Sequence, residues 1–180
     1  MRSALILFFS FSLFFSAQAQ YRESSKGGGG SFTDKIYFGG GGGFSGGSNY
    51  INVSLSPLVG YKITERFSSG VQLSYQYVRF NSYRANNYGG GPFMRFNFTQ
   101  KFFTYAQYEY MNYGLLTLPP DTGPRFDFNS LFVGLGYSEP IGKNVAFNIT
   151  ALYNLLYKDG TQSPYDSPLV FRVGIVAGLF

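Results

Sequence analysis

Polar side chains recur at every second position within several apolar runs of this sequence. The polar members that could take part in chemistry are Gln72, Gln76, Arg95, Gln107, Glu109, Asn148 and Arg172. Glu109 is the one acidic residue in the middle of such a run, and a carboxylate held away from water needs a cation beside it. We therefore expect Glu109 to pair with Arg95 or Arg172. The same groups could form either a sealed hydrogen-bonded plug or a narrow ion path.

The chain lacks two residue types that catalytic sites commonly use. It has no His and no Cys, whereas hydrolases and acyltransferases commonly use a His as base. No spacing places a Ser–Lys or Asp–Asp pair together, and no calcium-loop spacing occurs among Asp121, Asp127, Asp159 and Asp166. We expect a protein that is not an enzyme, without cofactor or metal. The Lys and Arg residues are scattered singly, which indicates no nucleic-acid partner.

The segments that must position these groups have the two-residue period of β-strands. In residues 145–157, VAFNITALYNLLY, apolar residues such as Phe147, Ile149 and Tyr153 fall on one parity, and Asn148 and Asn154 fall on the other. Successive side chains leave a strand on opposite faces. The run is long enough for a tilted strand that crosses a membrane, which needs about 9–11 residues.

The same pattern recurs along the chain and predicts about eight strands. The runs are residues 35–46, 50–61, 67–80, 88–98, 102–113, 128–138, 145–157 and 168–180. Short connections (62–66, 99–101, 139–144) alternate with longer ones (81–87, 114–127, 158–167). This alternation predicts an all-β, transmembrane, antiparallel up-and-down β-barrel. Eight strands enclose a lumen that side chains just fill, which favours the plug over the ion path.

Three local features refine this prediction. Pro57 cannot donate to a ladder, so we expect a bulge or break in pairing there. The glycine run at residues 39–43 lacks a phosphate-loop ending and predicts a close approach of backbone or side chain inside a narrow barrel. In the last strand, Arg172 is expected inside, with Phe171, Val173, Ile175, Ala177 and Leu179 outside and Phe180 beyond the regular wall.

The N-terminus predicts export. Arg2 precedes an apolar core, and Ala17 and Ala19 form the small-x-small pattern of a signal-peptide cleavage site. We expect a signal peptide at residues 1–19, cleaved after Ala19, a flexible lead-in at residues 20–34 and a barrel at residues 35–180.

With this leader, the alternating strands and the terminal Leu179 and Phe180, the chain resembles the small outer-membrane β-barrel family (porin-like, OmpA-type) of Gram-negative bacteria. The resemblance implies location in the cell outer membrane, contact with its lipid and lipopolysaccharide, and insertion by the outer-membrane assembly machinery. It also implies that Phe180 is the assembly signal.

Three functions are compatible with these features. The first is a structural barrel with a side-chain-filled lumen that contacts a surface ligand or partner protein through loops 114–127 and 158–167. The second is a narrow pore for small solutes or ions. The third is a secreted β-protein that self-associates through exposed strand edges.

Overall fold

The computed structural model describes residues 32–119, 123–158, 165 and 167–179. The expected leader, the lead-in up to residue 31 and the predicted assembly signal Phe180 lie outside the described residues. Parts of both predicted contact loops, at residues 120–122, 159–164 and 166, also lie outside them. In the described part of the chain, no helix has the length and apolarity needed to cross a membrane.

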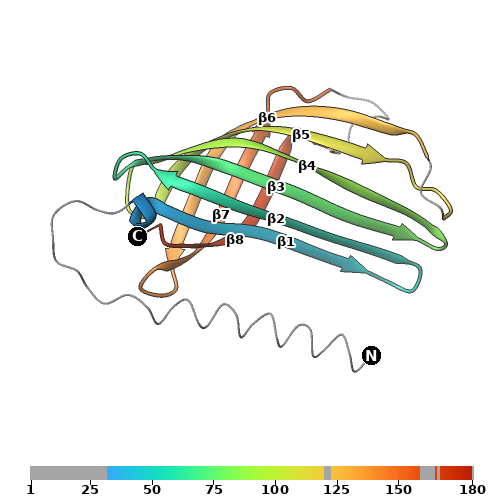
Figure 1. The fold of residues 1–180 in the computed structure, drawn as a ribbon, viewed down its shortest axis with the longest axis horizontal. Coiled ribbons are helices and arrows are strands. Elements are labelled where there is room, and N and C mark those ends of the chain that lie inside the picture. The colour runs from blue at the N-terminus through green and yellow to red at the C-terminus, as the bar shows by residue number, and fades with distance from the viewer. Residues whose placement is uncertain (1–31, 120–122, 159–164, 166, 180) are drawn as a thin grey trace. The chain divides into compact units, whose positions relative to one another are not determined.

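Eight antiparallel strands close into a barrel in sequence order, with β1 returning to β8 (Figure 1). This confirms the predicted all-β class and strand number. The strands are β1 (Ile36–Gly46), β2 (Tyr50–Lys62), β3 (Phe67–Phe80), β4 (Tyr83–Asn97), β5 (Phe102–Gly114), β6 (Arg125–Pro140), β7 (Val145–Asn154) and β8 (Leu169–Ala177).

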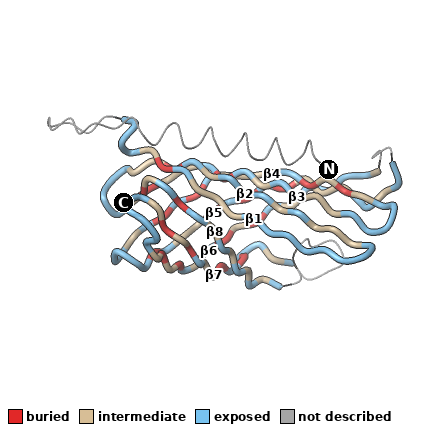
Figure 2. Tube along the Cα trace, turned by 90° about the horizontal axis from the view of Figure 1, so that it is seen from below, coloured by how far each residue is buried: buried red, intermediate tan, exposed pale blue. Residues whose placement is uncertain are grey.

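The burial pattern follows the alternation in the sequence. Along β7, Ala146, Asn148, Leu152 and Asn154 are buried, whereas Ile149 is exposed. Figure 2 shows the same change between buried and exposed positions along the strands. Alternate residues along each strand therefore face the inner and the outer side of the barrel wall.

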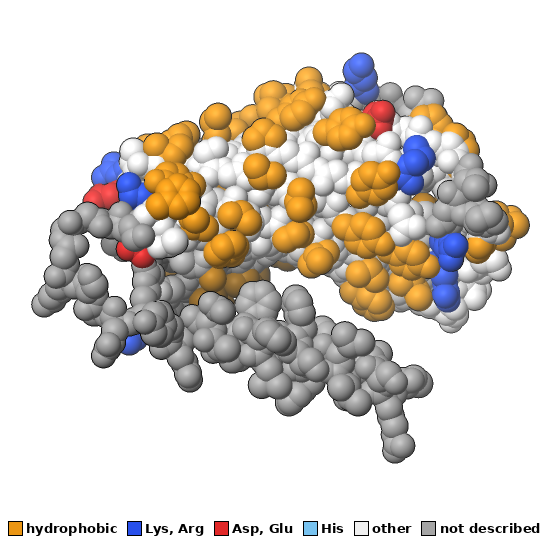
Figure 3. All heavy atoms as spheres, viewed as in Figure 1, with side chains coloured by type: hydrophobic (Ala, Val, Ile, Leu, Met, Phe, Trp, Pro, Cys, Tyr) orange, Lys and Arg blue, Asp and Glu red, His pale blue; other side chains and the backbone are white. Residues whose placement is uncertain are grey.

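The outer side of the barrel is apolar. Figure 3 shows apolar side chains spread over the visible wall, with Lys, Arg, Asp and Glu side chains gathered toward its two ends. Exposed apolar side chains come from strands all around the ring, including Leu55, Val59, Leu73, Met94, Phe96, Leu135, Ile149, Phe171, Val173 and Ile175. An apolar surface of this extent is uncommon on soluble monomers.

The connections differ in part from those expected. Residues 63–66, 98–101 and 141–144 are short turns at one end, which we call the turn end. At the opposite end, the loop end, the predicted long loop 81–87 is wrong, because only residues 81–82 separate β3 from β4. Asn81 has φ 54°, the left-handed conformation that tight hairpins need and that Asn tolerates. Residues 83–87, although polar, continue β4.

A short helical turn precedes the first strand. Phe32–Lys35 forms a turn of 3-10 helix, named η1, directly before β1. The Phe32 ring stacks on Tyr61 of β2 with centroids 5.0 Å apart. Residues 32–34 of the predicted lead-in thus belong to a short helical turn that contacts the barrel through Phe32.

An apolar cluster fills the turn end of the barrel. It comprises Tyr37, Phe93, Val176 and Leu179. Leu179, expected on the outer side, is buried instead, because Gly178 adopts φ 87° and breaks the strand alternation before it. Room for the rings comes from glycines on neighbouring strands. A Cβ at Gly60 would lie 2.1 Å from the Tyr37 ring, and one at Gly136 would lie 2.1 Å from the Phe103 ring.

Two of the local expectations hold. The β2–β3 pairing is interrupted at Ser56 and Pro57 and resumes in the same register at Leu58. Backbone approaches the glycine run closely, since a Cβ at Gly39 would lie 2.7 Å from the carbonyl oxygen of Ile175.

Candidate functional site: the barrel interior

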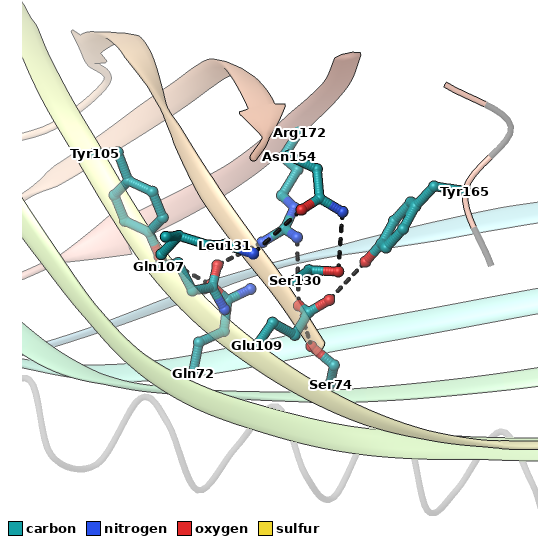
Figure 4. Close-up of polar contacts among 10 residues, drawn as sticks. All are labelled: Gln72, Ser74, Tyr105, Gln107, Glu109, Ser130, Leu131, Asn154, Tyr165 and Arg172. Atoms are coloured by element: carbon teal, nitrogen blue, oxygen red, sulfur yellow. Dashed lines mark hydrogen bonds and ion pairs between the residues drawn. The ribbon is translucent and has the colours of Figure 1, made fainter. Parts of the chain in front are cut away.

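A charged cluster occupies the middle of the lumen, formed by side chains from β5 and β8 (Figure 4). Nη2 of Arg172 lies 3.3 Å from Oε2 of Glu109, and Nη1 donates to Oε1 of Gln107 at 2.6 Å. Arg172 is therefore inside, as predicted, and it is Arg172 rather than Arg95 that pairs with Glu109. Cζ of Arg172 also lies 4.5 Å from the centroid of the Phe132 ring.

The Glu109 carboxylate is almost fully enclosed, with 2% of its surface exposed. The hydroxyl of Tyr165 donates to Oε1 at 2.5 Å, and Oγ of Ser74 donates to Oε2 at 3.3 Å. Together with Arg172, these donors satisfy both carboxylate oxygens. A buried carboxylate can persist in its charged form only with such partners.

The second lumen arginine, Arg95 on β4, lies apart from this cluster toward the turn end. It is 4% exposed, its Nε donates to Oδ1 of Asn97 at 2.8 Å, and its guanidinium lies 3.6 Å over the Phe103 ring. Within the described residues, no carboxylate pairs with it, and its two terminal nitrogens have no hydrogen-bond partner. It therefore contributes an uncompensated positive charge to the lumen.

The remaining predicted residues also lie on the inner side, in separate groups. Gln72 accepts a hydrogen bond from the hydroxyl of Tyr105 at 3.0 Å. Toward the loop end, Gln76 donates to Asn52 at 3.2 Å and accepts from Asn87 at 3.0 Å.

Two lumen amides keep an unpaired atom. Oδ1 of Asn148 and Nε2 of Gln107 have no hydrogen-bond partner among the described residues. The polar residues predicted from the sequence thus form several clusters rather than one network.

The aromatic part of the lumen was missed by sequence reasoning, which assigned the inner side to polar residues. Its main members are Tyr37, Phe93, Phe103, Tyr105 and Phe132. The signal was present. Phe93 shares the parity of Arg95, and Phe103 and Tyr105 share that of Gln107.

A cavity of about 510 Å³ remains inside the barrel. Its wall includes the glycines of β1, Gln72, Ser74 and Asn148, and the charged residues that line it are Arg95, Glu109 and Arg172. The expectation of a side-chain-filled lumen therefore holds at the turn end, where the apolar cluster packs, and is wrong along the middle. Among the described residues that line the cavity, two arginines and one glutamate give a net charge of +1.

Within the described residues, no group of three His, Cys, Asp or Glu side chains could hold a metal ion. No protein-family model matches the chain. A search of curated proteins gives no match either.

Proposed function

We propose that this protein is an integral outer-membrane β-barrel, similar to the small porin-like and OmpA-type barrels of Gram-negative bacteria, with a non-enzymatic, structural or surface-interaction role. The proposal depends on how apolar and charged side chains are distributed between the two sides of the barrel wall. Exposed apolar side chains surround the wall, whereas Arg95, Glu109 and Arg172 are directed inward. Transmembrane barrels have this arrangement because their outer face meets lipid.

Under this proposal, residues 1–19 direct export and are removed after Ala19, and the outer-membrane assembly machinery recognises Phe180. The apolar outer face contacts membrane lipid and lipopolysaccharide. The loop end, including the described parts of loops 114–127 and 158–167, is the surface available to a ligand or partner protein.

A narrow pore is the second candidate, favoured by the cavity and its charged lining. The turn-end cluster of Tyr37, Phe93, Val176 and Leu179 opposes it, because these side chains occupy the path that a solute would take. The secreted, self-associating alternative is less well supported, because ring closure pairs each strand on both sides over part of its length and leaves free edges mainly between β1 and β8.

The test is to place a charge on the outer wall. Leu73, near the middle of β3, is 58% exposed. On a soluble barrel Leu73→Arg is nearly neutral, whereas on a lipid-facing wall it costs about 2–4 kcal/mol at mid-depth. Leu118→Arg is the matched control, since Leu118 is 53% exposed in the loop after β5.

The mature chain and both variants would be refolded into phospholipid vesicles and unfolded with urea. The proposal is supported if Leu73→Arg alone loses about 2–4 kcal/mol of unfolding free energy and the folded protein gives a faster-running unboiled band on gels. Equal stability of the two variants would refute a lipid-facing wall. Conductance of the wild-type protein in planar bilayers would favour the pore over the structural barrel.

A further inference from the structure

The barrel closes incompletely between β1 and β8. The two strands pair only where Phe38 faces Ala177, Gly39 faces Val176 and Gly40 faces Ile175, whereas β1 pairs with β2 along its whole length. A Cβ at Gly41 would still lie 2.3 Å from the Val173 carbonyl oxygen of β8. A Cβ at Gly42 or Gly43, in contrast, would have only atoms of β2 within 4 Å. Figure 1 shows β1 and β8 diverging toward the loop end. We call this divergence the seam.

Cavities lie on both sides of the seam. On the outside, a groove of about 480 Å³ is bordered by the apolar side chains of Leu55, Pro57 and Phe147. The groove and the inner cavity share part of their lining, namely Gly40, Gly41, Gly42, Val173, Gly174 and Ile175. At this point the wall is mainly glycine backbone, without side chains to separate the lumen from the outer surface.

Such a seam has a physical consequence in a bilayer. Phe171, Val173 and Ile175 of β8 are exposed and apolar, so the seam lies within the apolar outer wall. Unpaired strand edges do not occur against lipid and persist only where they line a water-filled or protein-covered space. The seam therefore brings a polar, hydrated lumen directly beside hydrocarbon.

The described residues that line the inner cavity carry an excess positive charge. Arg172 is neutralised by Glu109, whereas Arg95 lines the same cavity with free terminal nitrogens, as described above. Asn148 lines it as well and has an unpaired oxygen. A guanidinium with free donors binds a carboxylate or phosphate oxygen strongly.

We infer that the interior binds a single-chain anionic amphiphile, such as a fatty acid, with its head group at Arg95 and its acyl chain leaving through the seam into the outer groove. The inner cavity has the size of a small-molecule site, about 300–1,000 Å³. This inference rests on the proposed membrane location, because the bilayer supplies both the ligand and the surroundings of its tail.

The absence of Trp from the chain allows a clean test. A single tryptophan at Leu55→Trp reports on the outer groove, and Met94→Trp, on the opposite wall at β4, reports on bulk lipid. Leu55 and Met94 are 57% and 56% exposed, respectively. Each protein, reconstituted in phospholipid vesicles, is titrated with 11-bromoundecanoate, whose terminal bromine quenches tryptophan, and with the neutral 11-bromoundecanol.

We expect saturable quenching of Leu55→Trp by the acid, weaker binding of the alcohol, and only linear quenching of Met94→Trp. Introducing Arg95→Gln into the Leu55→Trp protein should weaken binding of the acid about tenfold or more, which is the contribution expected of a hydrogen bond to a charged group. Binding of the alcohol should not change. Arg66→Gln, an exposed turn residue, is the charge control and should change nothing.

Filling the groove provides an independent variant. A Cβ at Gly42 would lie 3.0 Å from the Ser54 carbonyl oxygen and 3.8 Å from Cδ1 of Leu55, so Gly42→Leu adds a side chain on the groove side. We expect it to abolish saturable binding. Gly47→Leu, at a position with open space around it, is the control.

The outcomes separate the two proposals. Linear quenching at both reporters, or equal binding of acid and alcohol, in protein that runs faster unboiled and inserts into vesicles overturns the binding site alone. Failure to insert overturns the membrane location and the binding site together. The acid–alcohol comparison needs no arginine variant, so the inference can be tested even if Arg95→Gln does not fold.

Discussion

Neutralising Glu109 is the most direct test of the lumen architecture. Glu109→Gln keeps the side-chain volume but removes the charge that balances Arg172 at 3.3 Å. Losing one partner of a buried pair costs about 3–5 kcal/mol. Arg172 is 23% exposed and borders a cavity, so water can partly solvate it. We therefore expect a cost of about 2–3 kcal/mol, below that range and close to the cost of losing a hydrogen bond to a charged group.

Charge reversal should be far more damaging. Glu109→Lys would place three cations in the lumen with no anion among the described lining residues, and we expect no stable barrel. A charge swap, Glu109→Arg with Arg172→Glu, should recover part of the loss, because it restores the pair with opposite orientation.

The assay is urea unfolding of refolded protein, followed by tyrosine fluorescence and by the fraction that runs faster unboiled. Glu139→Gln is the matched control. Its pair with Lys101 has a similar N–O distance, 2.9 Å, but both side chains are nearly half exposed, and such pairs contribute at most about 1 kcal/mol. Unchanged stability of Glu109→Gln, or a Glu109→Lys protein with wild-type heat resistance, would refute the pairing argument.

Three further predictions concern packing and turns. Gly60→Ala should prevent stable folding, because its Cβ would overlap the buried Tyr37 ring, whereas Gly47→Ala should leave the urea midpoint within about 0.5 kcal/mol of wild type. Leu179→Ala should lower stability by about 2–3 kcal/mol as a core truncation, and no loss would mean that the residue faces outward after all. Asn81→Val should slow refolding and cost about 1–2 kcal/mol at a positive φ, with Asn81→Gly near wild type, and equal refolding of the two would argue against the two-residue turn.

The strand pattern was strong enough to predict the fold because each face of the wall has its own chemistry. Because Glu109 and Arg95 face the lumen, residues an even number of positions away, such as Gln107 and Phe93, are expected to face it too. Both residues are buried on the inner side in the structure. The pattern also placed Arg172 inside, since a lipid-facing arginine would be costly.

The sequence pattern fails where a turn, a glycine or an aromatic side chain interrupts the simple alternation of polar and apolar residues. Residues 83–87 are mostly polar and predict a loop, although Ala85 and Asn87 are buried as part of β4. Leu179 lies one residue beyond a glycine with positive φ, and parity cannot be carried through such a position. A polar inner side does not predict the inner aromatic residues, because this lumen is apolar at the turn end.

The sequence by itself determined the all-β class, the number of strands and the inward position of Arg95, Glu109 and Arg172, because side-chain alternation is a local property of the backbone. Tertiary structure alone decided which arginine pairs with Glu109, which rings lie over which glycines, and where β1 separates from β8. These features depend on the stagger between strands far apart in the chain, and no local period encodes that stagger.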